Sequence, residues 1–402
     1  MSQGPSLSKR VQSLKPSPTL ATDAKAKALK AQGVDIVNLS AGEPDFDTPA
    51  HIKEAAKEAI DQGFTRYTPV GGILELKEAI GAMLKNDYGL EYETGQIMVS
   101  TGGKQVLYNL AQAILDPGDE VIIPAPYWVS YPPIVELAGG VPVILETDPA
   151  NDFSISLERL SGLIGPKTKA IILNSPSNPT GAVYDRETVR RVGELACEKG
   201  IYIITDDIYD KIRFDGESPY NCASLVEAAK DLCLIVNGVS KTYAMTGWRI
   251  GYLAGPESVV KACTKIQSQS TSNPNSIAQK AALAALTGPQ DCIQEMKKAF
   301  QERAMAFVDG LLEIDGIKCP RPSGAFYCFP DMSAFFGRKT PQGKAIEGSL
   351  DLCDYLLDEA KVASIPGIAF GDDRCVRFSF ATDMATLNEG LKRIRSALNK
   401  LA

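Results

Sequence analysis

The 402-residue sequence predicts an α/β protein with a mostly parallel central sheet, helices on both faces of that sheet, and a second, smaller α+β domain. From about residue 51 to 290, short apolar runs alternate with stretches of helical composition. Several of these runs are apolar throughout, which is typical of parallel strands buried on both faces. Beyond residue 290, long helical stretches dominate. We therefore expect an N-terminal arm and part of the small domain in 1–45, the large domain in 46–290, and the small domain in 291–402.

The elements can be assigned in chain order. Residues 1–20 are polar and are expected to form an arm that lies on another surface, 21–32 has helical composition, and 33–40 alternates as a short strand. A turn-rich loop, 41–49, ends with a proline at an expected helix start. The helical stretches that follow are 51–62, 73–86, 104–115, 127–138, 155–163 and 186–198, and the strand candidates among them are 96–100, 120–123, 141–146, 170–174, 201–205, 232–236 and 251–254. In the last part, the helices are 290–314, 349–360 and 385–400, and the strands are 326–329, 362–365 and 376–379.

Charge and cysteine content narrow the class of protein. The 42 basic and 49 acidic residues give a net charge of −7, which argues against nucleic acid or an anionic membrane as a partner. The nine cysteines include no C-x-x-C pair, as is usual for reduced thiols in the cytoplasm. The N-terminus has no apolar region of a secretory signal, and no stretch approaches the roughly 18 apolar residues of a membrane span. We expect a cytoplasmic protein.

Histidine is scarce, because His51 is the only one. Any Ser-His-Asp triad would have to use it, and no G-x-S-x-G motif accompanies it. Histidine-rich zinc sites are excluded, and the sequence contains neither a Walker A motif nor G-x-G-x-x-G. No metal site is expected.

The most informative stretch is 238–251, which follows the apolar run Leu234-Ile235-Val236. It contains Lys241 and, eight positions later, Arg249. A lysine that loses hydration has a lowered pKa, and its neutral amine attacks carbonyls. An arginine offers a rigid fork of donors for a phosphate. The combination suggests pyridoxal phosphate, an aldehyde with a phosphate tail, although a lone lysine is more often a solvated surface residue.

Three polar residues follow predicted strands, where α/β sheets present groups to ligands. Asp206 comes directly after strand 201–205 and could pair with the pyridine nitrogen, or could be a turn or N-cap residue. Tyr209 could hold the phenolic oxygen of the cofactor, or could be a half-buried tyrosine with a satisfied hydroxyl. Asn178, in a Pro-rich turn, could share its amide between that oxygen and a substrate carboxylate, or could serve the turn alone.

Two further features are suited to anions. In Ser100–Gln105, Gly102 and Gly103 precede a helix start and can expose backbone N–H groups to a phosphate, although such turns also serve packing. Arg377 lies in an apolar strand and needs a partner or an exit to solvent. A bidentate grip on a substrate α-carboxylate would provide one, and an edge strand that lets the side chain reach solvent is the alternative.

Together these stretches resemble the fold-type I, pyridoxal-phosphate-dependent class I aminotransferases, most nearly the bacterial and plastid aspartate aminotransferases, some of which also use prephenate. The resemblance extends over essentially the whole chain. Residues 238–251 match the lysine signature of the family at every constrained position. Stretches 41–49, 126–131, 178–181 and 323–327 occur in the expected order. The departures are small: Asp207 replaces a glutamate, and Asp210-Lys211 replaces a Glu-His pair.

The resemblance implies a role for each matching residue. Lys241 would be the Schiff-base lysine and proton shuttle, Asp206 would pair with the pyridine nitrogen, and Tyr209 and Asn178 would hold the phenolic oxygen. The other implied contacts are the ring with Trp128, the phosphate with Gly103, Lys104, Ser240 and Arg249, and the substrate with Gly42, Trp128, Asn178 and Arg377. Tyr67 would reach the phosphate of a neighbouring subunit, so that a homodimer shares its active sites. Lys15 matches a basic position near a second substrate carboxylate, and a solvated arm lysine is the alternative.

The expected function is that of an aminotransferase whose large domain binds pyridoxal phosphate. The first choice of substrates is aspartate or glutamate with oxaloacetate or 2-oxoglutarate, with prephenate, which would give arogenate, as a further acceptor. Alanine, aromatic amino acids and kynurenine are the alternatives within the class. A non-transaminase pyridoxal enzyme and a cofactor-binding regulator rank below these.

Overall fold

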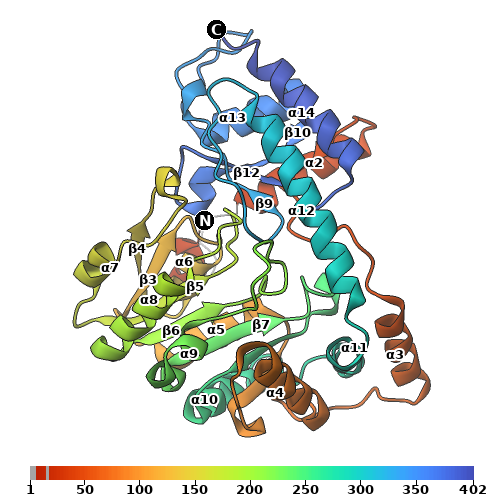
Figure 1. The fold of residues 1–402 in the computed structure, drawn as a ribbon, viewed down its shortest axis with the longest axis vertical. Coiled ribbons are helices and arrows are strands. Elements are labelled where there is room, and N and C mark those ends of the chain that lie inside the picture. Colours follow the sequence, from red (N-terminus) through yellow and green to blue (C-terminus); the bar gives the residue numbers. More distant parts are fainter. Residues whose placement is uncertain (1–5, 15–17) are drawn as a thin grey trace, which may run out of the picture.

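The central element of the fold is a β-sheet that is covered by helices. The computed structural model describes residues 6–14 and 18–402, and across these residues the largest sheet has seven strands in the order β2-β8-β7-β6-β5-β3-β4 (Figure 1). The strands are β2 Ile97–Ser100, β3 Glu120–Ala125, β4 Val141–Glu146, β5 Thr168–Asn174, β6 Tyr202–Asp206, β7 Cys233–Gly238 and β8 Gly251–Ala254. Strand β8 is antiparallel to β2 and β7, and the other neighbours are parallel. The predicted fold class is confirmed.

Helices cover both faces of this sheet, because successive side chains of a strand point to opposite sides. In β7, Leu234 and Val236 belong to one apolar cluster, whereas Cys233 and Ile235 belong to another. The helices that contribute to the first cluster are α5 Gly103–Ile114, α6 Tyr131–Leu137 and α10 Glu257–Ser268. Those that contribute to the second include α3 Ala50–Asp61, α4 Leu74–Tyr88, α8 Arg186–Lys199 and α11 Ser276–Thr287.

A smaller lobe combines the C-terminal segment with part of the N-terminal one. Helix α12 (Asp291–Leu312) extends from the large lobe into it (Figure 1). Val37 and Leu39 share an apolar cluster with C-terminal residues such as Phe378, so both chain ends build this core. Its strands are β1 Val37–Asn38 paired with β10 Val362–Ala363, and the antiparallel set β11 Ile365–Pro366, β12 Val376–Ser379 and β9 Tyr327–Cys328. Its helices are α2 Pro18–Ala31, α13 Ser349–Tyr355 and α14 Met384–Leu398.

Short elements complete the chain. They are the helices α1 Lys9–Ser13, α7 Leu157–Leu163 and α9 Cys222–Leu225, the 3-10 turns η1 Thr94–Gln96, η2 Pro149–Asn151, η3 Glu227–Asp231, η4 Thr246–Trp248, η5 Ser333–Phe335 and η7 Gly367–Phe370, and the π-turn η6 Leu356–Ala360. None of the helices in the described part of the chain has both the length and the apolarity that a bilayer crossing requires.

One predicted boundary is wrong in a way that matters for the site. The helix expected over 127–138 begins only at Tyr131, with prolines in its first turn. Proline is tolerated there because the first N–H groups of a helix have no internal partner. Residues 127–130 are therefore left as a loop, and this loop places Trp128 on the wall of the cavity described below. Similarly, only Val37–Asn38 of the strand predicted over 33–40 pairs with a neighbour.

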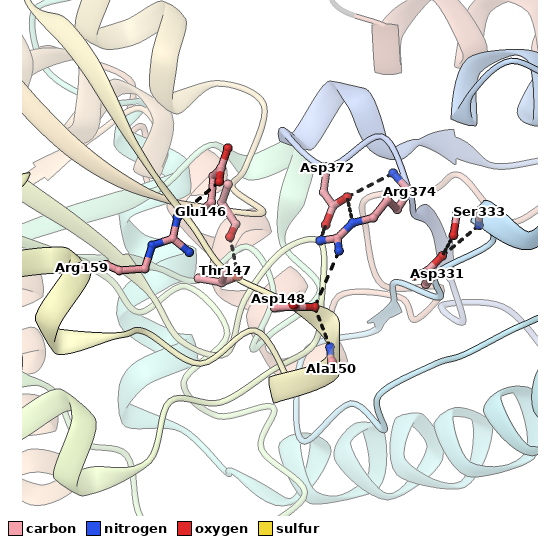
Figure 2. Close-up of polar contacts among 10 residues, drawn as sticks. Glu146, Thr147, Asp148, Ala150, Arg159, Asp331, Ser333, Asp372 and Arg374 are labelled. Atoms are coloured by element: carbon pink, nitrogen blue, oxygen red, sulfur yellow. Dashed lines mark hydrogen bonds and ion pairs between the residues drawn. The ribbon is translucent and has the colours of Figure 1, made fainter. Parts of the chain in front are cut away.

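The lobes also meet at a polar contact beside β4 (Figure 2). Asp148 accepts a hydrogen bond from the backbone N of Ala150 at 3.0 Å, and its Oδ1 lies 3.7 Å from Nη1 of Arg374. Asp372 holds that guanidinium through hydrogen bonds of 3.0 and 2.8 Å. Because Asp148 and Arg374 are about half exposed, their ion pair contributes at most about 1 kcal/mol.

Candidate active site

A cavity of about 440 Å³ opens at the carboxyl ends of the parallel strands, between the two lobes. Polar side chains line it from strands β5, β6 and β12 and from the loop after β7. Of the site residues expected from the sequence, those on its wall are Gly42, Gly103, Lys104, Trp128, Asn178, Asp206, Tyr209, Ser240, Lys241, Arg249 and Arg377. The chain thus brings together residues more than 300 positions apart.

Two expected residues are not on this wall. Tyr67 lies between α3 and α4 with 92 % of its surface exposed, and it does not line the cavity of its own chain. Lys15 lies outside the described residues.

Lys241 follows strand β7 and points its amine into the cavity. Its Nζ donates a hydrogen bond to the carbonyl oxygen of Gly42 at 2.7 Å. Burial lowers the pKa of this amine to about 8, the nearby charge of Glu43 opposes the shift, and the cations Arg249 and Arg377 add to it. A substantial fraction of the amine is therefore neutral near physiological pH, as a nucleophile or base requires.

The backbone around Lys241 brings Arg249 to the end of α5. Gly102 has φ +84°, and a Cβ at this position would lie 2.3 Å from Nη2 of Arg249. A Cβ on Gly251 would lie 2.3 Å from the backbone N of Gly103. Glycine is required at both positions because the guanidinium and strand β8 pack directly against the loop that begins α5.

This corner of the cavity is suited to a dianion. The N-terminus of α5 offers backbone N–H groups and a positive dipole end, and Lys104 and Arg249 add two cations. Burial, and then the charge of Arg249, lower the pKa of Lys104, whose Nζ lies 4.9 Å from the centre of the Trp128 ring. Among the described residues, neither cation forms an ion pair with a carboxylate, so the positive charge remains available to a ligand.

The wall of the cavity also includes a buried carboxylate. Asp206 ends strand β6, and its Oδ2 accepts a hydrogen bond from the hydroxyl of Tyr131 at 2.6 Å. Burial raises the pKa of Asp206 to about 6, although the bond from Tyr131, a backbone N–H and the charge of Lys241 act in the opposite direction. The carboxylate is thus mostly ionised at neutral pH, and it could form an ion pair with a protonated ring nitrogen of a ligand in the cavity.

Tyr131 was not recognised from the sequence. It is 2 % exposed, and its ring contacts Trp128 edge to face, with 5.4 Å between the centroids. Its position three residues after Trp128, in the same motif, was the available signal. Its hydroxyl meets Asp206 because α6 packs beside the end of strand β6. This is a tertiary contact between residues 75 positions apart, which the sequence does not show directly.

Replacement of Tyr131 with phenylalanine is expected to raise the pKa of Asp206 above about 6. The lost hydrogen bond favours the ionised carboxylate, so its removal should shift the pKa upward by roughly one unit. The measurement is a pH titration of the ¹³C-labelled aspartates by NMR, in which the Asp206→Asn variant identifies the resonance of Asp206. Tyr127→Phe in the same loop should leave the titration unchanged, and an equal shift in both variants would contradict the assignment.

Asn178 and Tyr209 face the middle of the cavity. Asn178 accepts a hydrogen bond at Oδ1 from Nη1 of Arg377 at 3.0 Å, and its backbone N donates to Oδ1 of Asn174 at 2.9 Å. The hydroxyl of Tyr209 lies 3.0 Å from that of Tyr327. Tyr327 is a second residue that sequence reasoning missed: its strand was predicted, but its contact with Tyr209 depends on how the two lobes meet.

Arg377 is a buried cation that forms no ion pair with a carboxylate among residues 6–14 and 18–402. It is 5 % exposed, on the middle strand of its sheet, which excludes the edge-strand alternative. Its guanidinium donates to Asn178 and, at 2.8 Å, to the carbonyl oxygen of Ser40, while its Nε is buried without a partner. Within the described part of the chain, no carboxylate lies at ion-pair distance from it. A buried charge of this kind is costly unless an anion joins it, so the guanidinium is placed to receive an anion.

Comparisons with known proteins agree with this geometry. Residues 34–394 match the profile of the family aminotransferase class I and II. The chain is 50 % identical to an aspartate/prephenate aminotransferase of Nitrosomonas europaea, over 98 % of this chain and 100 % of that protein. It is 48 % identical to an aspartate aminotransferase of Bacillus subtilis, over 98 % and 99 %.

Solved structures give the same result. An aspartate aminotransferase from Rhizobium meliloti superposes with a TM-score of 0.96 at 46 % identity, over 99 % of this chain and 100 % of that one. An aspartate aminotransferase from Thermus thermophilus with maleate has a TM-score of 0.92 at 44 % identity, over 98 % and 100 %.

Proposed function

Because the chain belongs to the class I and II aminotransferase family, we propose that it transfers the amino group of aspartate or glutamate to a 2-oxo acid, with pyridoxal phosphate as cofactor. One observation carries the proposal: one cavity is lined by a lysine amine of lowered pKa, a buried carboxylate and a buried arginine that pairs with no carboxylate of the described residues. The names of relatives at about half identity over the full length support the choice of substrates.

The residues present fit the cofactor. The corner formed by Gly103, Lys104, Ser240 and Arg249 would hold the phosphate, and Asp206 would pair with the ring nitrogen. Trp128 would stack on the ring, and Tyr209 and Asn178 would hold the phenolic oxygen. When bound, the cofactor supplies an aldehyde that reacts with amines and a ring that withdraws electrons from the substrate carbon.

The side chains of the protein would perform four tasks around this group. Arg377, with Asn178 fixed beside it, binds the α-carboxylate and orients the substrate. Lys241 would accept the α-proton of the substrate at Nζ and pass the same proton on to the bound cofactor. Asp206 keeps its negative charge opposite the ring nitrogen. The rings of Tyr327 and Phe370, at 4.5 and 5.1 Å from the guanidinium of Arg377, shield that cation from water.

The pH dependence of cofactor capture should report the pKa of Lys241. Only the neutral amine attacks an aldehyde, so the rate constant for capture of pyridoxal phosphate by the cofactor-free protein should rise with pH through about 8 and then become constant. The reaction can be followed by stopped-flow absorbance. A rate that continues to rise toward pH 10, as for an ordinary lysine, would show that the amine is not buried as described.

The acceptor proposed besides oxaloacetate and 2-oxoglutarate is prephenate, as in the name of the Nitrosomonas europaea relative. Prephenate carries two carboxylates, for which Arg377 and Lys15 are the proposed grips. Lys15→Ala should weaken the use of prephenate and aspartate, and unchanged kinetics with both would remove Lys15 from the proposal.

We also propose a homodimer in which Tyr67 reaches the phosphate of the neighbouring subunit. Two features of the single chain support it. Tyr67 is almost fully exposed, and a hollow of about 530 Å³ lies beside Arg249, lined by residues such as Thr101, Trp248 and Asn275. Sedimentation would test the dimer.

A cytoplasmic location is proposed as well, supported by nine cysteines that are all unpaired thiols.

The experiment that tests the function is a panel of amino donors against 2-oxo acids. The proposal predicts that aspartate and glutamate give the highest kcat/KM with oxaloacetate or 2-oxoglutarate. A preference for alanine, aromatic amino acids or kynurenine would overturn the substrate assignment, and an absence of transamination with every pair would overturn the reaction.

A further inference from the structure

The side-chain amide of Gln267 lies at the end of α10 and is fully buried. Its Oε1 accepts hydrogen bonds from the hydroxyl of Ser100 at 2.6 Å and from Nδ2 of Asn109 at 3.1 Å. Its Nε2 donates to the carbonyl oxygens of Val70 at 2.8 Å and Val99 at 2.9 Å. Both acceptor positions and both N–H groups of the amide are therefore used.

These four bonds connect two segments with different tasks. Val99 and Ser100 end strand β2, directly before the loop that starts α5 and forms the anion corner. Val70 belongs to the segment 67–73, which begins with the exposed Tyr67. The backbone supports the same connection, because the N–H of Val99 donates to the carbonyl oxygen of Gly71 at 2.9 Å.

The segment 67–73 is packed closely against the strand as well as bonded to it. Gly72 has φ +100°, and a Cβ there would lie 2.6 Å from Cγ2 of Val99. A buried amide with four partners fixes their relative positions, since a shift of either segment would leave buried polar groups unpaired. The position of Tyr67 is thus defined relative to the anion corner of its own chain.

A second buried glutamine holds the segment 67–73 without contacting the anion corner. Oε1 of Gln279 accepts from the backbone N of Ile73 at 2.8 Å, and its Nε2 donates to Oγ1 of Thr68 and to the carbonyl oxygen of Pro274, both at 3.0 Å. Two buried amides therefore hold the segment 67–73. Gln279 does not contact the loop that starts α5, whereas Gln267 joins the segment to that loop.

We propose that Gln267 is a positioning residue for both active sites of the dimer: it holds the phosphate loop of its own site and, through Val70, the segment that presents Tyr67 to the neighbouring site. The inference rests on the proposed function, and specifically on the dimer with shared sites. It predicts that a change at Gln267 in one subunit alters cofactor binding in the other subunit.

Hybrid dimers separate the two effects. Lys241→Ala in one subunit leaves a single lysine-containing site, which receives Tyr67 from the altered subunit. When that same subunit also carries Gln267→Met, we expect the dissociation constant of pyridoxal phosphate at the remaining site to increase roughly tenfold, as for the loss of a hydrogen bond to a charged group. The readout is equilibrium titration of the cofactor-free hybrid, followed by the absorbance of the lysine-bound cofactor.

Two control hybrids sharpen the interpretation. Ser100→Ala in the Lys241→Ala subunit removes one bond to Oε1 of Gln267 but keeps the bond from Nε2 to Val70, so it should change the dissociation constant less than Gln267→Met does. Gln279→Met at the same place should weaken binding, because it also holds the Tyr67 segment. If Gln267→Met does not fold, Gln267→Glu, which keeps the shape and the acceptor oxygen but lacks both N–H donors, takes its place with the same expected direction.

The outcomes distinguish this inference from the proposed function. If the native protein is monomeric or does not bind pyridoxal phosphate, the proposed function fails. If the native dimer binds it and Tyr67→Phe in the Lys241→Ala subunit weakens binding, while Gln267→Met there leaves the dissociation constant unchanged, only the role of Gln267 is overturned.

Discussion

Replacement of Lys241 with alanine is expected to reduce kcat by at least roughly 10²–10⁴-fold, which is the contribution of a positioned general base alone. The amine points into the cavity, with Nζ 2.7 Å from the carbonyl oxygen of Gly42, and burial lowers its pKa to about 8. Among the expected site residues it is the proposed proton carrier, since Asp206 is held by Tyr131 and the Arg377 guanidinium remains charged. The measurement is the steady-state rate with aspartate and 2-oxoglutarate at saturating cofactor.

Lys265→Ala is a suitable control, because this exposed lysine near the end of α10 lies outside the cavity. It should retain the native rate. A Lys241→Ala variant with near-native turnover would remove the lysine from the reaction, whatever its position.

Replacement of Asp206 with asparagine is expected to lower kcat by roughly 10²–10³-fold, as for the loss of one preorganised electrostatic partner. Asparagine has nearly the same shape, and its oxygen can still accept the hydrogen bond of Tyr131. The expected loss of kcat therefore comes from the negative charge of Asp206. This charge is buried in the wall of the cavity, and no side-chain cation of the described residues is hydrogen-bonded to it. Kinetics should show the decrease in kcat with a smaller change in KM, because Arg377, the proposed binding residue for the substrate carboxylate, is unchanged.

Asp210→Asn is the matched control for this prediction. Asp210 is also buried and lies four residues further on, but its carboxylate accepts from Tyr88 at 2.8 Å and Asn237 at 2.9 Å and does not line the cavity. Its replacement should change stability more than kcat. Equal losses of kcat in both variants would indicate a general effect of buried charge and would contradict the specific role of Asp206.

The seven strands of the large sheet were predicted close to their observed positions, whereas helices α10 and α11 were not predicted. The apolar runs around Leu234 and Ile203 are strands because both faces are covered, and apolar continuity is the direct sequence record of that burial. The positions of Asp206 and Lys241 followed from the strands that precede them, because parallel strands end at one edge of the sheet. Their proposed chemical roles came from residue type together with family resemblance.

Features that depend on distant segments could not be read from the sequence. Tyr131 and Tyr327 take part in the site because the lobes meet there, and Ser40 contributes only a carbonyl oxygen, which no residue type reveals. Gln267 was missed because no helix was predicted over α10, and a glutamine in such a helix gives no sign of being buried. The helix boundary at Tyr131 was missed because the composition of 127–130 does not exclude a helix.

Some assignments remain predictions for a different reason. The role of Tyr67 concerns a second subunit, and that of Lys15 concerns a residue outside the described part of the chain. The division of the chain at residues 45 and 290 also stays a prediction. The positions of Val37 and Leu39 in the core of the small lobe are consistent with it.

The central claim is that the amine of Lys241 meets the aldehyde of a cofactor anchored by Arg249 and Asp206. The most direct measurement is to load the protein with pyridoxal phosphate, reduce it with borohydride, digest it and locate the added mass by mass spectrometry. We predict that the phosphopyridoxyl group is found on Lys241, and that Lys241→Ala prevents this labelling. A label on Lys104 or on a surface lysine in the native protein, with Lys241 unmodified, would contradict the claim.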